Sequence, residues 1–472
     1  MSLSTRHTRR DPGQSPVPAV AELSIGIFRR DLLAFFPQTL LEPVGTVPSP
    51  SEGHSAAPNF RVLDGPASAS IEIELFGTLY RLTARDGTPF TPQDRRMVRA
   101  IGAVMSMRYY HVFQMSSSLR LELYRGGSED HYVAAFLEPS AYAPTATQPS
   151  RIASTIQTLR TAALSTYENR RVSTGALLLG TLADPAHAPM PTAPDALPYG
   201  VELTGLKSVL RLCDGKRTLF LVDHAGRLTE IIDIERWAAA IPPPDSAEIP
   251  CARAYAPHAR STRVGGHVCL VLSPNQEIKL FSGGVQAFVF AHGRWRILDP
   301  ATRFAVWVAA IADQHLARVL FQAALDLAEG RQGGLFVVVD DPCAATGHLL
   351  AAHDLLSTEV PCGPPAELAP RDPLAKRALH YLARGRNVTD LDPAVLEALA
   401  SLDGALVTDR AGRLLAFGAI LRHDASDLPE LSATEGARTT AAVVASRFGP
   451  VLKVSEDGVV SCFLNGALAW DL

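Results

Sequence analysis

The feature that most constrains the fold of this chain is a series of short patterns that occurs twice after residue 150. Each pass has a helix-like segment, an apolar strand, an Asp-Gly turn, the pattern D-x-A-G-R-L, and serine, aromatic, glycine and alanine positions at equal offsets. Such an order predicts two copies of one supersecondary unit. Two unrelated β-hairpins with glycine turns would also contain D-x-A-G-R-L, and that alternative stays open. The first pass occupies 151–171, 174–179, 214–215, 223–228 and 273–288, and the second occupies 304–329, 333–338, 403–404, 409–414 and 455–470.

Proline-rich stretches divide the chain into candidate domains. The 472 residues suffice for about three domains, and a hydrophobic content of 47% can give each of them a core. We expect an α/β protein with a disordered tail (1–20), an N-terminal α+β domain of sensor type (21–145), a diverged α/β copy or sensor domain (151–300) and a C-terminal α/β domain (301–472). The candidate linkers or surface loops are 1–20, 139–150, 183–198, 241–250 and 360–373.

Local patterns predict several elements. Residues 71–75 alternate like a half-buried strand, and Thr91-Pro92 begins a helix with a hydroxyl cap. Residues 118–124 and 131–137 flank Gly126-Gly127 as a β-hairpin. In the second pass, Asp390-Leu391-Asp392-Pro393 caps an extra helix.

Composition excludes some classes of partner. A formal charge of −4 and a pI near 6.4 leave no basic stripe for a nucleic-acid polymer. The six cysteines are scattered, without zinc-ligand spacing, and we expect reduced thiols. Asp313, His315 and Arg318 interrupt the best candidate for a membrane helix, and the N-terminal residues lack the apolar core of a secretion signal. We therefore expect a cytoplasmic protein without a membrane partner.

The C-terminal part contains the components of a phosphate site. Asp403-Gly404 supplies a turn carboxylate, Gly436-Ala437-Arg438 opens a helix whose amides can hold phosphate oxygens, and Ser455-Glu456-Asp457 ends a strand with an acidic pair. These patterns predict nucleotide chemistry. Each of these patterns also has a purely structural explanation, because both acidic segments can form β-turns and Arg438 can form a surface ion pair.

These residues resemble the diadenylate cyclase (DAC) domain, a family that condenses two ATP molecules into cyclic di-AMP. The family pattern is a buried helix, a G-A-L-I-V-I strand, an Asp-Gly-Ala turn, a G-T-R-H-R-A-A helix start and an S-E-E strand end. The resemblance covers residues 304–472 and implies a mixed sheet flanked by helices. The matching residues are Gly334-Leu335-Phe336-Val337-Val338, Asp403-Gly404-Ala405, Gly436-Ala437-Arg438-Thr439-Thr440-Ala441-Ala442 and Ser455-Glu456-Asp457.

The resemblance implies a role for each site residue. Asp403 would be catalytic, on the side of the ribose hydroxyl or of the metal, because in-line attack on an α-phosphate needs a carboxylate and a metal. Glu456 and Asp457 would assist that metal, Mg²⁺ or Mn²⁺. The residues implied in nucleotide binding are Gly404, Ala405, Gly436, Ala437, Arg438, Thr439 and Thr440.

The chain departs from the family at the helix start. The family's R-H-R triplet grips the triphosphate, whereas Thr439 and Thr440 here offer neutral hydroxyls, and Ala437 replaces the preceding threonine. In the first copy we align Thr262-Arg263 with this helix start, and Ser273-Pro274-Asn275 lacks the acidic pair.

These departures lead us to expect a nucleotide-binding sensor or a slow cyclase in signalling of the cyclic di-AMP type. An active diadenylate cyclase and a non-catalytic scaffold are the alternatives. The expected partner is ATP or a cyclic dinucleotide, and the assembly is a homodimer or an intramolecular pseudo-dimer of the two copies.

Overall fold

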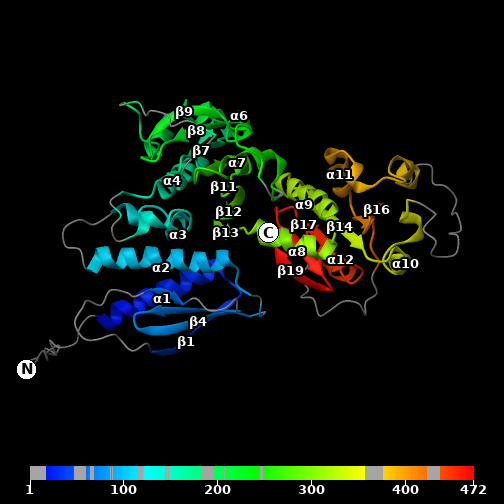
Figure 1. The fold of residues 1–472 in the computed structure, drawn as a ribbon, viewed down its shortest axis with the longest axis horizontal. Coiled ribbons are helices and arrows are strands. Elements are labelled where there is room, and N and C mark those ends of the chain that lie inside the picture. Colours follow the sequence, from blue (N-terminus) through cyan, green and yellow to red (C-terminus); the bar gives the residue numbers. More distant parts are fainter. Residues whose placement is uncertain are drawn as a thin grey trace, which may run out of the picture.

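The computed structural model has a mixed α/β architecture, as expected (Figure 1). It consists of an N-terminal part, a first unit with a seven-stranded sheet and a second unit with a six-stranded sheet. We call residues 151–297 unit 1 and residues 300–472 unit 2. The structure describes residues 17–46, 60–63, 69–113 without 86 and 88, 121–143, 146, 148–182, 184, 186–187, 193, 195–244 without 207, 248–356, 376–422 and 436–472.

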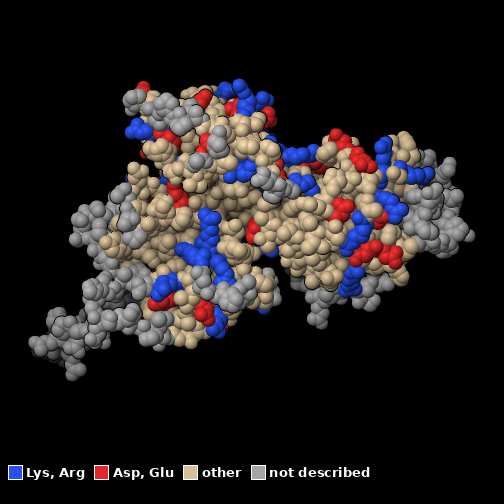
Figure 2. All heavy atoms as spheres, viewed as in Figure 1, with Lys and Arg blue, Asp and Glu red and all other residues tan. Residues whose placement is uncertain are grey.

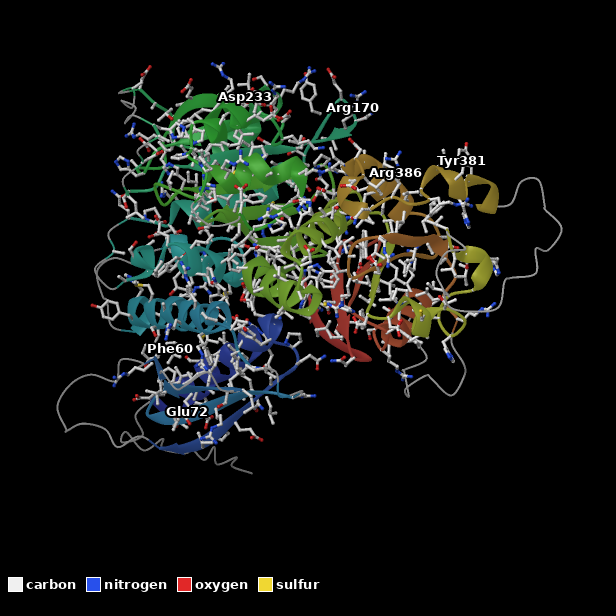
Figure 3. The ribbon with its side chains drawn as sticks, turned by 45° about the vertical axis from the view of Figure 1, so that its right-hand side comes forward. Phe60, Glu72, Arg170, Asp233, Tyr381 and Arg386 are labelled. Carbon is white, nitrogen blue, oxygen red and sulfur yellow. The ribbon has the colours of Figure 1, made fainter. Side chains whose placement is uncertain are left out.

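The N-terminal part is an antiparallel sheet of order β1-β4-β3-β2 packed on two helices. The expected strand at 71–75 is confirmed, with Ile71 and Ile73 fully buried. Phe60 lies on Gly102, where an added Cβ would come within 2.0 Å of its ring (Figure 3). Residues 1–16 of the expected tail lie outside the described residues, whereas residues 17–20 begin helix α1, so the expected boundary at 20 is wrong. The elements are α1 (Val17–Phe35), β1 (Thr39–Thr46), β2 (Arg61–Leu63), β3 (Ser70–Leu75), β4 (Thr78–Ala84) and α2 (Pro92–Phe113).

The start of α2 is confirmed, and its cap explains it. The amide of Asp94 donates to Thr91 Oγ1 at 3.2 Å, and the amide of Thr91 donates to Asp94 Oδ2 at 2.7 Å. This reciprocal pair satisfies two amide donors at the helix start.

The expected hairpin at 118–137 is wrong. Residues 114–120 lie outside the described residues, Leu121–Tyr124 is a short 3-10 helix, and Ser128–Leu137 is helix α3. Every residue of α3 from Asp130 to Phe136 is buried. A helix buried on all sides loses the apolar periodicity that would distinguish it from a strand.

Unit 1 begins with α4 (Arg151–Ala163), which ends before the expected residue 171. A small hairpin of β5 (Thr166–Tyr167) and β6 (Arg170–Arg171) follows, and its turn residues Glu168 and Asn169 have φ angles of 49° and 61°. The sheet has the order β13-β12-β11-β10-β7-β8-β9. The elements are β7 (Thr174–Leu178), α5 (Val209–Leu212), β8 (Thr218–Val222), β9 (Leu228–Asp233), α6 (Ile234–Ala239), α7 (Ala256–Ser261), β10 (Val268–Leu272), β11 (Ile278–Ser282), β12 (Val285–Ala291) and β13 (Arg294–Ile297).

Unit 2 begins with two helices where we expected one. Ala312 takes a left-handed conformation with φ 63°, and the Asp313 carboxylate then accepts from the amides of His315 and Leu316, which starts the second helix. The extra helix capped by Asp392 is confirmed as α11. The elements are α8 (Pro300–Ile311), α9 (Gln314–Glu329), β14 (Gly334–Val339), α10 (Pro342–Ala345), α11 (Pro393–Ala400), β15 (Ala405–Asp409), β16 (Leu414–Ala419), α12 (Ala437–Ala445), β17 (Val451–Val454), β18 (Val460–Leu464) and β19 (Ala467–Asp471).

The two larger sheets share a strand order. Unit 1 reads β12-β11-β10-β7-β8-β9 and unit 2 reads β19-β18-β17-β14-β15-β16. In unit 1, β7 pairs parallel with β8 and antiparallel with β10. In unit 2, β14 pairs parallel with β15 and antiparallel with β17. A bulge also recurs: the register shifts between Leu280 and Phe281 in unit 1 and between Cys462 and Phe463 in unit 2.

The repeated D-x-A-G-R-L pattern is a capped hairpin turn in both units. Asp223 Oδ1 accepts from the amides of Ala225 and Arg227 at 2.9 and 2.8 Å. Asp409 Oδ1 accepts from the equivalent amides two and four residues on, at 3.0 and 2.9 Å. Both carboxylates are buried, so their role here is to hold the turn.

Two sequence alignments between the units need correction. Thr262-Arg263 follows the end of α7, and Thr262 Oγ1 accepts from the amide of Gly284 at 3.1 Å. Ser446, after the end of α12, accepts from the amide of Gly466 in the same way at 2.9 Å. Thr262 therefore corresponds to Ser446, not to the start of α12.

The second misaligned pair is the Asp-Gly turn. A Cβ at Gly215 would meet the backbone of Thr174, whereas one at Gly404 would meet that of Gly418. The register of β7 with β8 and that of β14 with β15 can each be continued to the start of the strands. Thr218, not Gly215, then lies in the position that Gly404 has in unit 2.

Two expectations from composition can be compared with the structure. Among the described residues, none of the helices combines the length and apolar character that crossing a bilayer requires. Cys213, Cys251, Cys269 and Cys462 have free thiols, and burial raises the pKa of Cys213 and Cys462 to about 12. Cys343 is disulfide-bonded, so the expectation of reduced thiols is wrong at that position.

Candidate functional site

Several predicted site residues of unit 2 lie at one edge of its sheet. Gly334 pairs with Val454 of β17, and the parallel register of β14 with β15 continues to place it opposite Gly404. Asp403 precedes β15 and Ser455 follows β17, the two neighbours of β14, so both residues lie at the edge of the sheet where β14 begins.

Arg438 lies across this edge, over Gly333. A Cβ added to Gly333 would be 1.9 Å from Arg438 Nη1, so the guanidinium packs directly on this glycine. Arg438 Nη1 also donates to Glu456 Oε1 at 3.3 Å, with the two side chains 37% and 75% exposed. An ion pair this exposed contributes no more than about 1 kcal/mol, so an incoming anion can compete for Arg438.

Lys453 is a second cation at this edge, and sequence reasoning missed it. Lys453 Nζ donates to Thr439 Oγ1 at 2.9 Å, which joins β17 to the first turn of α12. Val451, Leu452 and Val454 around it are buried. A lysine within an apolar strand was the available signal, because a charged side chain is costly there without a partner or a function.

A cavity of about 430 Å³ opens between α12, β17 and β18 beside these cations. Its polar lining consists of Thr439, Lys453, Ser455, Asp457, Ser461 and Asp471, and Phe463 forms part of its apolar lining. This volume is in the range of small-molecule sites. Hydroxyl groups, one ammonium group and an aromatic face can together bind a phosphate and a flat ring.

The helix start is placed as expected. Gly436 is the N-cap of α12, and no side chain caps it. Gly436 and Ala437 are exposed, and Arg438 and Thr439 follow in the first turn. Thr440 is not among the residues that line the cavity.

Asp403, Gly404 and Ala405 have different environments. Asp403 is exposed and lies two residues before the start of β15. Gly404 has φ 103°, and a Cβ there would come within 2.5 Å of the Gly418 backbone, so this glycine is required by β16. Ala405 is 1% exposed and belongs to the core. Contacts of Gly404 and Ala405 with a nucleotide stay predictions.

The two carboxylates after β17 already have partners. The Ser455 hydroxyl donates to Asp457 Oδ1, and this hydrogen bond, the largest cause, lowers the pKa of the Asp457 carboxyl below its ordinary value. Arg331 donates to the backbone oxygen of Asp457, and Glu456 pairs with Arg438.

The donors for Mg²⁺ or Mn²⁺ are therefore few. Among the described residues, no group of three or more His, Cys, Asp and Glu side chains is placed to hold a metal ion. Mg²⁺ is commonly held by one or two carboxylates together with substrate phosphates, and the exposed Asp403 can supply one such ligand. The metal roles of Glu456 and Asp457 stay predictions.

Comparison with known proteins identifies no family for this chain. No protein-family model and no curated protein matches it. A double mutant of DacA from Staphylococcus aureus is similar over 33% of this chain and 86% of that chain, at 21% identity and a TM-score of 0.22. A hypothetical membrane spanning protein from Bacillus cereus is similar over 35% of this chain and 69% of that chain, at 21% identity and a TM-score of 0.23. Function has to be inferred from the residues of the chain itself.

Proposed function

We propose that unit 2 binds the phosphate groups of an adenine nucleotide, either ATP or a cyclic dinucleotide. The observation that carries the proposal is the pair of cations at one edge of the sheet, Arg438 over Gly333 and Lys453 beside Thr439. Both lie next to the first turn of α12, where backbone amides and the helix dipole favour an anion. The resemblance of the surrounding motifs to the DAC domain supplies the identity of the nucleotide.

A sensor or a slow cyclase of cyclic di-AMP signalling fits these residues better than an efficient enzyme does. Arg438 can bind a phosphate through two hydrogen bonds, but Thr439 contributes only a neutral hydroxyl. Lys453 restores a charge without the planar fork of an arginine. Since charge-assisted hydrogen bonds are about twice as strong as neutral ones, the triphosphate should be held less firmly than by an R-H-R triplet.

An active diadenylate cyclase is the second candidate, and the exposed carboxylate of Asp403 favours it. Asp403 would orient the attacking ribose hydroxyl and share an Mg²⁺ or Mn²⁺ ion with the phosphate oxygens. When bound, such an ion supplies positive charge where negative charge develops on the α-phosphate. A scaffold without a ligand is the third candidate.

A cyclase reaction would also need a second ATP, and unit 1 is a poor source of a second site. Counting back from the matched caps Thr262 and Ser446 places Tyr255 in the position of Thr439. The Tyr255 side chain is fully buried there. We therefore propose that catalysis, if present, uses unit 2 of another chain in a homodimer rather than an intramolecular pair.

The test of nucleotide binding is a thermal-shift titration with ATP, ADP and cyclic di-AMP. A ligand at a hundred times its dissociation constant should stabilise the wild type by about 2.7 kcal/mol. Arg438→Gln and Lys453→Met should each weaken binding about tenfold or more, because each removes a charged hydrogen-bond donor. Arg386→Gln is the matched control, since Arg386 is an exposed arginine of the same unit (Figure 3).

The outcomes separate the candidates. Equal affinities in the wild type and all three variants would contradict the placement of the site. If none of the nucleotides stabilises the protein, the scaffold without a ligand is the candidate that remains. Incubation of the wild type with ATP and Mn²⁺, followed by chromatography for cyclic di-AMP, tests the cyclase. Product that persists in Asp403→Asn would contradict the role of Asp403.

A further inference from the structure

A second cavity, of about 530 Å³, lies where the N-terminal part and both units meet. Its walls come from the end of α1, from β13, from the start of α8, and from the turn after β17. Figure 1 shows β13 and α8 near the centre of the molecule. Figure 2 shows basic side chains gathered in the middle of the face, where the N-terminal part adjoins the rest. A cavity shared by three parts of a chain is a common place for a ligand.

The edge strand β13 presents two arginines to this cavity. Arg294 and Arg296 are two residues apart, so they lie on one face of the strand, and both line the cavity. Trp295 between them points the other way: it is 3% exposed, and its Nε1 donates to Asp130 Oδ1 at 2.7 Å. This buried hydrogen bond fixes the strand and therefore the direction of both arginines.

The guanidinium of Arg296 lacks a partner within the described part of the chain. Its Nε is buried and makes no hydrogen bond. Burial, the largest cause, lowers the pKa of Arg296, while Asp457, Glu277 and Asp471 oppose the shift from a distance. A charge removed from water without a direct partner is unfavourable, and a bound anion would relieve that cost.

The other charges around the cavity are largely paired with one another. Lys279 Nζ contacts Glu277 Oε2 at 3.1 Å and Glu329 Oε2 at 2.7 Å, and Arg331 pairs with Glu277. Asp94 caps α2 through Thr91. The lining cations without an ion pair among the described residues are Arg294, Arg296 and Arg303, and the lining carboxylates without one are Asp94, Asp457 and Asp471.

We propose that this cavity binds a small molecule that carries a dianionic group, a phosphate or a pair of carboxylates, held by Arg294, Arg296 and Arg303. Guanidinium groups bind both kinds of anion through paired hydrogen bonds. The apolar lining, which includes Phe36 and Val460, accommodates the rest of the molecule. This cavity shares Asp457, Val459 and Asp471 with the cavity of unit 2, but its cations Arg294, Arg296 and Arg303 do not line that cavity.

The experiment measures binding of inorganic phosphate, pyrophosphate, succinate and citrate to the whole chain by calorimetry and thermal shift, with ionic strength held constant by sodium chloride. At least one anion should bind the wild type saturably and raise the Tm. Arg296→Gln should weaken that binding about tenfold or more. Arg294→Gln should do the same without a risk to folding, because Arg294 is exposed. Preference for phosphates or for carboxylates identifies the source of the ligand.

Two further proteins make the result decisive. Arg170→Gln, on the surface hairpin of β5 and β6 (Figure 3), is the matched control and should bind like the wild type. Arg438→Gln should also retain the binding, which separates this cavity from the candidate site of unit 2. The proposal is overturned if none of the four anions binds more tightly than chloride, or if Arg294→Gln and Arg296→Gln bind as the wild type does.

Discussion

The two units have the same strand order but differ at one position. A side chain of unit 1 fills the place where unit 2 has its cavity. Tyr255 of unit 1 is fully buried, with its ring centroid 5.8 Å from that of Phe281 and 5.3 Å from Lys279 Nζ. Thr439 and Ser461 of unit 2 correspond to Tyr255 and Lys279, and both line an open cavity. The sheet therefore folds with or without an open site, and the site is a property of a few side chains.

This comparison supports the proposal that the units arose by duplication. The bulges before Phe281 and Phe463, and the capped turns of Asp223 and Asp409, occur in both units although Tyr255 fills the place of the cavity in unit 1. Their agreement has to come from the fold itself. Unit 1 contacts unit 2 through Arg253, which forms a 2.9 Å ion pair with Asp326 of α9.

The largest effect that separates the units is expected from Tyr255→Thr, which copies the residue of unit 2 into unit 1. Removing a buried aromatic side chain costs about 3 to 5 kcal/mol, so the amides of β10 and β11 should lose protection from hydrogen exchange by that amount. The converse variant, Thr439→Tyr, should fill the cavity of unit 2 and abolish nucleotide binding while changing stability little. Similar losses of stability in both variants would contradict the comparison.

The second difference concerns pH, because unit 1 has His258 where unit 2 has Ala442. His258 Nε2 donates to the Gly215 carbonyl at 3.0 Å, and burial, the largest cause, lowers the pKa of His258 to about 4. Asp214 and the rings of Tyr255 and Phe281 are the other groups that face it.

The neutral imidazole is favoured in the folded state, so its stabilisation is complete above about pH 6.5 and is lost as the pH falls through about 4. The unfolding free energy of unit 1 should fall by roughly 3 kcal/mol over that interval. His258→Leu should be less stable at pH 7 but should lose less between pH 7 and pH 4.5, measured by exchange protection in β7 and β8. Parallel pH profiles for the variant and the wild type would exclude this role for His258.

Sequence reasoning succeeded where long, ordered patterns or local capping rules determine the structure. The offsets shared by 273–288 and 455–470 reflect a common hairpin with a bulge, and Asp392 starts α11 where its carboxylate accepts an amide hydrogen. Short dipeptides gave wrong alignments between the units. Asp214-Gly215 and Thr262-Arg263 match motifs of unit 2 by composition but occupy other places in the fold.

The candidate site was predictable only in part. Asp403, Arg438 and Glu456 could be named from motifs that lie far apart in the sequence. The contact of Arg438 with Gly333, and the hydrogen bond from Lys453 to Thr439, depend on packing between α12 and the sheet. Such contacts have no local signature, because they join residues that are distant along the chain.

The smallest expected effect is the same in both units and tests what they share. Thr262 and Ser446 each accept a hydrogen bond from a turn amide, that of Gly284 or Gly466, and each is buried. Thr262→Val and Ser446→Ala remove the hydroxyl with little change of shape, so each should cost about 1 to 2 kcal/mol through an unsatisfied amide. Exchange protection of Gly284 and Gly466 measures the loss. If the turns are equivalent, the two losses agree within the error; a loss in one unit alone would mean that the shared caps hold the turns by different means.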